Sequence, residues 1–167
     1  NAEITRVGQD WQRNISDDVR EITVESVLDL EGLPRDYIEN HPPGEDGLIH
    51  INTTYPDYIP FMRYAKNAEA RERLYLEYNN RAFPANLEVL MEVLRKRYEL
   101  AQLLGYDNYA EYITDDKMIG SATNAQEFID RIHDLRRETA DHDVSLLLDR
   151  KMQDDPSARR LQDWETA

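Results

Sequence analysis

The sequence predicts a mainly α-helical protein with a minor, short β ribbon in its first third. Apolar residues recur every three or four positions over residues 87–104 and again over residues 125–152, which is the period of an amphipathic helix. Before residue 55, the β-favouring stretches are short and lie at residues 21–24 and 47–52. Residues 41–46 contain two prolines and a glycine and predict a turn just before the second stretch, so we expect the two stretches to pair.

Two shorter helices are expected between the first stretch and residue 84. Pro34 is suited to a first helical position and Asp36 to a first turn, so residues 32–38 predict a short helix. From Tyr55 onward the pattern is helical, with Asn67 as a helix N-cap and an end near Pro84. The apolar stripe of this second helix consists of Leu74, Tyr75, Tyr78 and Ala82.

Three further helices are expected in the rest of the chain. The stripe over 87–104 stops at Gly105, a residue that readily ends a helix, and residues 108–118 predict a short helix. Thr123 and Gln126 have the spacing of a capping box and begin the last long helix. Its expected stripe is Ala125, Phe128, Ile129, Ile132, Leu135, Val144, Leu147, Leu148 and Met152.

Composition excludes several classes of protein. The 167 residues carry 34 Asp and Glu against 20 Lys and Arg, a formal charge of -14 that repels nucleic acids and anionic lipids. No run approaches the roughly 18 apolar residues of a membrane span. The absence of cysteine excludes disulfides and agrees with a cytoplasmic location. We therefore expect neither a nucleic-acid partner nor a membrane partner.

The length predicts one domain. The chain begins without methionine, and we interpret Asn1 and Ala2 as the remnant of an expression tag. Residues 3–167 are then expected to form a single helical domain that belongs to a longer protein.

Motifs for catalysis are absent from the sequence. There is no glycine-rich phosphate loop, no Gly-x-Ser-x-Gly and no His-Glu-x-x-His. Glu138 and His142, four residues apart on one predicted helix face, come nearest to a metal site, but in so acidic a chain a solvated face is the favoured interpretation. We assign no catalytic residue and no metal ligand.

Basic residues cluster in the middle of this acidic chain. A cluster of this kind can bind an anion such as a peptide carboxylate, or it can pair with the acids interleaved in it, such as Glu92 and Glu99. The cluster consists of Arg71, Arg73, Arg81, Arg95, Lys96 and Arg97.

The order of several segments resembles a known family. These segments are residues 14–18, 32–37 and 55–60, followed by Arg81, Asn86, Leu90, Arg97, Ala101, Leu104-Gly105-Tyr106, Tyr109-Ala110, Lys117-Met118, Ser121, Phe128 and Trp164-Glu165. In this order they resemble the middle region of the thimet oligopeptidase, neurolysin and dipeptidyl carboxypeptidase family of zinc metallopeptidases.

The resemblance implies a function for the longer protein rather than for this chain alone. Members of that family hydrolyse short peptides with a zinc ion bound by a His-Glu-x-x-His helix, and that motif is not present here. The chain then corresponds to a helical wall of the substrate channel, without zinc and inactive alone, whose partners are short peptides and the rest of the longer chain. Arg81 and Arg97, at family-matched positions, are the candidates for substrate binding. The alternative is a freestanding acidic helical module for protein interaction.

Overall fold

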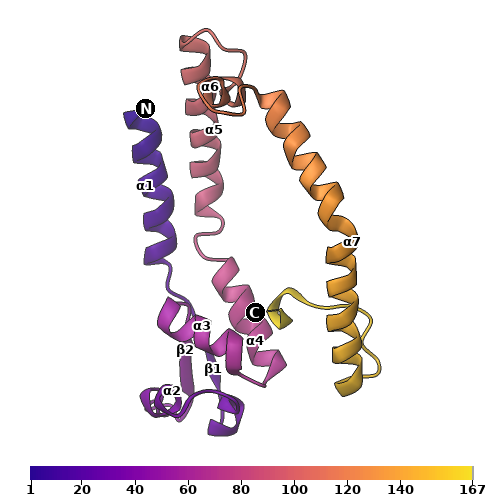
Figure 1. Cartoon of the computed structure of the whole chain (residues 1–167). Coiled ribbons are helices and arrows are strands. Elements are labelled where there is room, and N and C mark those ends of the chain that lie inside the picture. The colour runs from indigo at the N-terminus through magenta and orange to yellow at the C-terminus, as the bar shows by residue number, and fades with distance from the viewer. Residues whose placement is uncertain (167) are drawn as a thin grey trace. The chain divides into compact units, whose positions relative to one another are not determined.

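The computed structural model describes residues 1–166 and is mainly helical, as predicted (Figure 1). It divides into two compact units. The ribbon unit comprises Trp11–Leu87 together with the chain from Gln162 onward, and the long-helix unit comprises Asn1–Asp10 and Glu88–Leu161. The expectation that residues 3–167 fold as one domain, with a tag remnant at Asn1 and Ala2, stays a prediction.

The predicted β ribbon is confirmed in the ribbon unit. Strands β1 (Glu21–Val24) and β2 (Ile49–Asn52) pair antiparallel, with Ile22 opposite Ile51 and Val24 opposite Ile49. These four side chains are buried while their neighbours in sequence are more exposed, so one face of the ribbon points inward. β2 begins two residues later than the sequence indicated, because Gly47 has a positive φ of 79° and belongs to the preceding turn.

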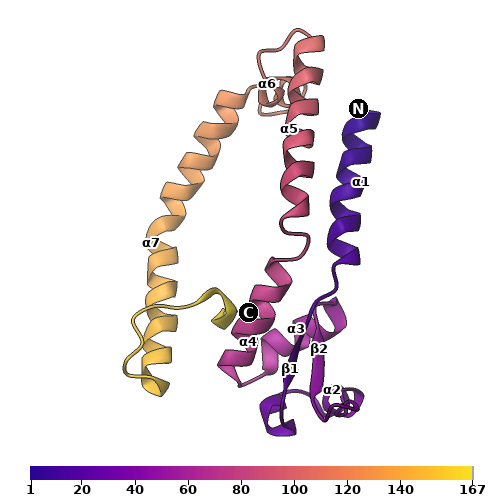
Figure 2. The ribbon, with the colours of Figure 1, turned by 180° about the vertical axis from the view of Figure 1, so that it is seen from behind.

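Helices cover the inward face of the ribbon. Both views show α3 (Tyr55–Tyr64) and α4 (Ala68–Asn79) beside the two strands (Figures 1 and 2), and α3 packs mainly on β2 and α4 on β1. Asn67 caps α4 as predicted, since its side chain accepts a hydrogen bond from the Ala70 amide. The helical elements of this unit are the 3-10 helices η1 (Val27–Leu30) and η2 (Asp163–Glu165) and the helices α2 (Arg35–Asn40), α3 (Tyr55–Tyr64) and α4 (Ala68–Asn79).

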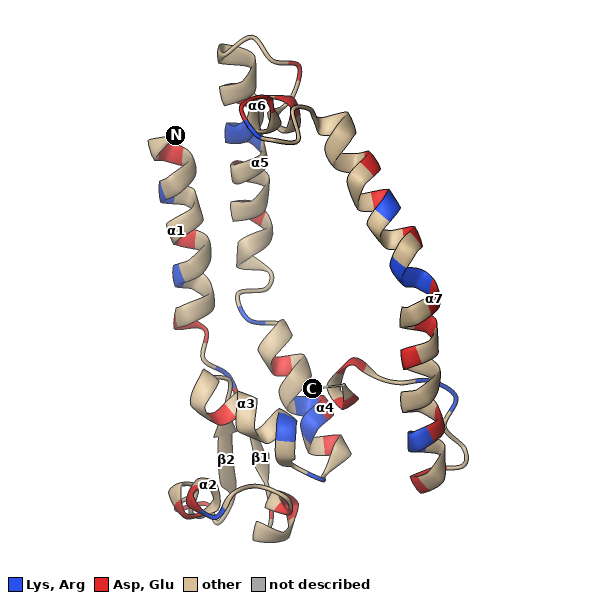
Figure 3. Ribbon diagram, viewed as in Figure 1, with Lys and Arg blue, Asp and Glu red and all other residues tan. Residues whose placement is uncertain are grey.

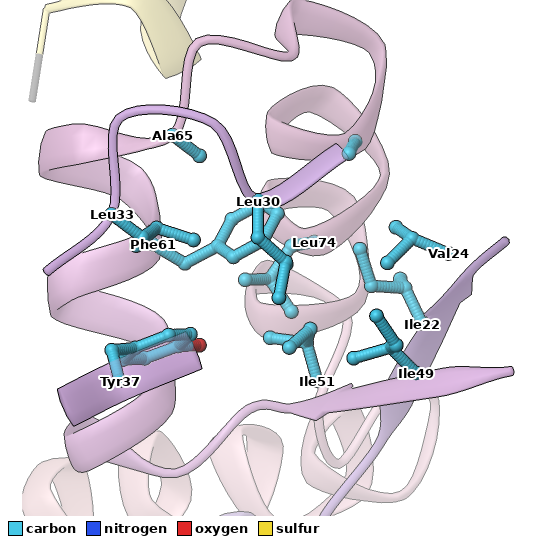
Figure 4. Close-up of a cluster of buried hydrophobic side chains, with 11 residues drawn as sticks. Ile22, Val24, Leu30, Leu33, Tyr37, Ile49, Ile51, Phe61, Ala65 and Leu74 are labelled. Carbon is cyan, nitrogen blue, oxygen red and sulfur yellow. The ribbon is translucent and has the colours of Figure 1, made fainter. Parts of the chain in front are cut away.

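A single apolar cluster holds the ribbon unit together. Leu30, Phe61 and Leu74 come from η1, α3 and α4, are completely buried and converge above Ile49 and Ile51 of β2 (Figure 4). Burying side chains of this size stabilises a fold by about 1.5–3 kcal/mol each. The ribbon, α3 and α4 therefore depend on one another.

Gly32 lets the chain turn tightly between η1 and α2. Its φ of 96° is unfavourable for a residue with a side chain. In addition, a Cβ at this position would collide with the main-chain carbonyl oxygen of Tyr64 at the end of α3. The turn can therefore lie directly against α3.

Two of the helices predicted for the long-helix unit are confirmed, and the last long helix begins earlier than predicted. The unit contains α5 (Ala85–Leu103), whose first three residues belong to the ribbon unit, then α6 (Tyr109–Asp115) and α7 (Ala122–Asp154). Gly105, with a φ of 84°, follows α5 as expected. The predicted capping box at Thr123 is wrong, because Ser121 has extended backbone and its side chain accepts from the Asn124 amide, which leaves Thr123 inside α7.

Helix α1 (Ala2–Asp17) was not predicted from the sequence. Its apolar residues Ile4, Val7, Trp11 and Ile15 are spaced by three or four, which is the signal that could have revealed it. Among them Val7 is buried. With so few apolar residues among charged ones, this helix owes its stability to packing more than to its own sequence.

Asp18 connects α1, β1 and the loop after α4 within the ribbon unit. Its carboxylate accepts hydrogen bonds from the guanidinium of Arg20 and, at 2.6 Å, from the amide of Ala82. Ala82 has a positive φ of 61°, so this bond holds a backbone conformation that alanine rarely adopts. Arg20, just before β1, and Thr53, just after β2, in turn exchange two hydrogen bonds, from Arg20 N to Thr53 Oγ1 and from Thr53 N to Arg20 O.

Asn86 fixes the C-terminal half of α1 in the same unit. It is 6 % exposed, accepts at 2.8 Å from the amide of Asn14 and donates to the carbonyl oxygen of Trp11. Both bonds join residues that are far apart in the sequence, 72 positions for Asn14 and 75 positions for Trp11. A buried amide with two such partners orients α1 against the start of α5.

We predict that Asp18→Asn destabilises the chain by about 2 kcal/mol at pH 7, since two charge-assisted hydrogen bonds are weakened. The Arg20 guanidinium and then the Ala82 amide hold the pKa of Asp18 below its usual 3.8. The stabilisation is therefore present above pH 3.8 and is lost as the pH falls through the lowered pKa. Urea unfolding of both proteins from pH 7 to pH 2 should show the difference shrinking in acid, and a constant difference would contradict the assignment.

We further predict a decline in stability at alkaline pH that depends on His50. Its Nδ1 lies 3.0 Å from Glu21 Oε1 and its Nε2 lies 3.0 Å from Asp46 Oδ2, so the protonated imidazole bridges the two carboxylates, and these bonds, led by that to Glu21, raise its pKa. The contribution is complete below the ordinary pKa of 6.5 and is lost as the pH rises through the raised value. His50→Gln should flatten the stability profile from neutral to mildly alkaline pH, and an unchanged profile would rule out this role.

Candidate functional site

Arg81, the first candidate for substrate binding, lies just after α4 in the ribbon unit. Its guanidinium carbon is 3.8 Å from the centre of the Tyr78 ring, and Tyr58 stacks on Tyr78 with ring centres 3.7 Å apart. At these distances the Arg81 guanidinium and the Tyr58 ring must lie on opposite faces of the Tyr78 ring. Arg81 also donates from Nε to the Tyr78 carbonyl at 3.0 Å and from Nη1 to the Thr53 carbonyl at 3.4 Å. Its side chain is thus engaged in bonds within the fold.

Arg81 also borders a hollow of about 300 Å³ between α1 and the junction of α4 with α5. Aromatic and aliphatic side chains provide most of the lining, which also includes Arg81, Asn79 and Asn86. Such a surface suits an apolar side chain with a polar group beside it. The lining residues are Trp11, Ile15, Tyr78, Asn79, Arg81, Ala82, Phe83, Asn86 and Leu87.

Arg97, the second candidate, belongs to the long-helix unit. It is an exposed residue of α5, and its guanidinium carbon is 5.2 Å from the centre of the Tyr109 ring of α6. Within residues 1–166 no carboxylate lies at ion-pair distance from it. Arg97 therefore has free donors for an anion, whereas Arg81 uses donors on main-chain carbonyls. The two candidates belong to different units.

Much of the remaining basic cluster forms local bonds. Arg95 pairs with Glu92 and Glu99, and these acids raise its pKa, the Glu92 hydrogen bond most strongly. Lys96 pairs with Glu3 at 2.9 Å and with Glu99 at 3.1 Å. The interleaved acids Glu92 and Glu99, together with Glu3 of α1, thus pair with these two cations, as one of the two interpretations of the cluster predicted.

The two arginines of the cluster on α4 differ from each other. Arg73 donates to the Thr23 carbonyl of β1 and so attaches α4 to the ribbon. In Arg71 the buried Nε has no hydrogen-bond partner within the described part of the chain. Arg71 therefore retains an unused donor.

Glu138 and His142 lie four residues apart on α7, and both are exposed. In the described residues, 1–166, no group of three or more His, Cys, Asp or Glu side chains could hold a metal ion. Catalytic zinc takes three protein ligands, so Glu138 and His142 do not by themselves fit such a centre.

Acidic and basic residues intermingle along α7 (Figure 3).

Within residues 1–166, no helix is both long enough and apolar enough to cross a membrane.

Sequence reasoning did not identify the bonds that Asp18, Thr53 and Asn86 form. Apart from the bond between Asp18 and the nearby Arg20, these bonds join residues between 28 and 75 positions apart in the chain. The resemblance gave the one available signal, because it included residues 14–18 and Asn86 without indicating what they do.

Comparisons with known proteins agree on one family. The model of peptidase family M3 matches residues 61–167. Thimet-like oligopeptidase of Dictyostelium discoideum is 33 % identical over 127 residues, which cover 75 % of this chain and 19 % of that protein. Saccharolysin of Saccharomyces cerevisiae is 32 % identical over 131 residues, covering 75 % and 18 %, and oligopeptidase A of Escherichia coli is 30 % identical over 149 residues, covering 80 % and 21 %. The chain spans about a fifth of the length of these relatives.

The contacts predict different costs for losing the two candidate arginines. Arg81→Ala should lower the free energy of unfolding by about 1–2 kcal/mol, because two main-chain carbonyls lose their donor. Arg97→Ala should change it by less than about 0.5 kcal/mol, as expected for an exposed side chain without such bonds. Urea unfolding followed by circular dichroism measures both, and equal losses would contradict the distinction.

Proposed function

The chain belongs to peptidase family M3, and we propose that it forms part of the helical wall of the substrate channel in a zinc-dependent oligopeptidase. The match of the family model to residues 61–167 carries this proposal. Two of the relatives above have names that describe them as oligopeptidases. Because the chain spans about a fifth of their length, the activity is proposed for a longer protein that contains it.

Short peptides are the proposed substrates. A channel between helical walls admits chains that fit between them and excludes folded proteins, and selection by size would then be the contribution of this segment. Arg97 is the preferred candidate for contact with a peptide carboxylate, because its guanidinium is exposed and has no ion-pair partner among residues 1–166. Arg81 stays a second candidate at the edge of an apolar hollow.

Zinc is assigned to the longer protein and not to this chain. The described residues offer no set of three ligands, so we assign none of them a role in activating water and expect residues 1–167 alone to be inactive. A cytoplasmic location is proposed as well. Since some relatives have names that place them in organelles, fractionation of cells that contain the longer protein is the test of this location.

The experiment uses the longer protein encoded by the parent gene. It should cleave short peptides and should lose this activity on treatment with a chelator. It should not cleave a folded protein whose amino-acid composition matches that of the peptides. Residues 1–167 alone should cleave none of them. A longer protein without peptidase activity would support the alternative, a freestanding acidic module for protein interaction.

Arg97→Gln in the longer protein tests carboxylate recognition. We predict that KM rises about tenfold for a peptide with a free carboxylate, which is the loss of roughly one charge-assisted hydrogen bond, and is unchanged for the amidated peptide. Arg95→Gln is the matched control on the same helix, since Arg95 is paired with Glu92 and Glu99. Equal effects on both peptides would remove Arg97 from substrate recognition.

A further inference from the structure

The long-helix unit has almost no apolar core of its own. Among its described residues, the buried apolar side chains are Val7, Ala101 and Ala158, all small or medium in size. The large buried side chains of the chain, such as Phe61 and Leu74, belong to the ribbon unit. Burial of apolar surface is the main term that stabilises a fold, so this unit requires apolar surface from elsewhere.

Helix α7 has an exposed apolar face of the kind that packs against another helix. None of the 33 residues of α7 is buried, although Phe128, Ile129, Ile132 and Leu135 lie on one face with exposures of 53, 59, 42 and 70 %. Phe128 lies four positions before Ile132, and Ile129 and Leu135 lie three positions to either side of it, which is the pattern of a helix that packs along another helix. Ala125, one turn earlier, continues the same face.

Helix α5 has a similar face. Leu90, Met91, Leu94 and Tyr98 follow one another at helical spacing and are 40, 66, 49 and 56 % exposed. Lys96, which the spacing places on the other side of α5, pairs with Glu3 of α1. One side of α5 is thus occupied within its own unit, while the apolar side is open.

We propose that the apolar faces of α5 and α7 are covered by helices of the same polypeptide that lie outside residues 1–167. The inference rests on the proposed function, which takes this chain to be part of a longer family M3 peptidase. The matched relatives contain about four-fifths of their length beyond the aligned region, which is ample chain to supply such helices.

A second copy of this chain is a poorer occupant for charge reasons. Each chain carries a formal charge of -14. Helix α7 carries eight acidic residues against five basic ones, so two such helices would bring a net excess of like charge together. The covering surface is therefore expected to be apolar in the centre and neutral or basic at its edges.

Amide hydrogen exchange tests the proposal without any assay of activity. In the longer protein, amides of α7 from residue 125 to 135 should exchange at least about tenfold more slowly than in residues 1–167 alone, because packing suppresses local opening. Amides of β2, which is buried in the ribbon unit, provide the internal reference. Equal exchange of α7 in both proteins would overturn the proposal.

Paired substitutions locate the covered face. Ile132→Ser should lower the melting temperature of the longer protein by several degrees, as large-to-small changes in a core do, and should leave that of residues 1–167 unchanged. Arg131→Ser, on the charged side of α7, is the matched control and should change neither. An isolated chain that is dimeric and that Ile132→Ser converts to a monomer would assign the face to a second copy instead.

Peptidase activity is measured separately on the same preparations. Protection of α7 in a longer protein that cleaves no peptide would uphold this inference while the proposed function fails. A longer protein that cleaves peptides but does not protect the amides of α7 would uphold the proposed function while this inference fails.

Discussion

The ribbon unit depends on one carboxylate at a point where three segments meet. Asp18 follows α1 directly, holds Arg20 just before β1 and accepts a hydrogen bond from the amide of Ala82 in the loop after α4. The apolar cluster can form between the ribbon, α3 and α4 because these segments enter it from fixed positions. Apolar contacts supply most of the stabilisation, but they have little direction, and the hydrogen bonds of Asp18 and Asn86 select one arrangement.

The sequence was sufficient for features that depend on neighbours in the chain. Asn67 as the cap of α4, Gly105 after α5 and the two β runs could be predicted because each depends on only a few adjacent residues. The cap of α7 was misplaced by two residues, since Ser121 and Thr123 both have side chains able to accept from an amide and the backbone decides between them.

The candidate site was predictable only as a set of residue types. Arginines at positions 81 and 97 are equivalent as letters in a sequence, but Arg81 meets the carbonyl of Thr53, 28 positions away, and Arg97 lies over the Tyr109 ring. Folding makes one of them part of the scaffold and leaves the other with free donors. Contacts across such distances follow from the tertiary structure, and a single sequence contains no local pattern for them.

The tight turn at Gly32 also has a consequence for sequence divergence. A Cβ at that position would meet the main-chain carbonyl oxygen of Tyr64, which no substitution at position 64 removes, whereas the Lys66 side chain nearby could move aside. Proteins with the same ribbon and the same helix α3 should therefore conserve glycine at this position while the surrounding residues diverge. Gly32 provides a fixed register point for aligning distant sequences, even where overall identity is too low to guide the alignment.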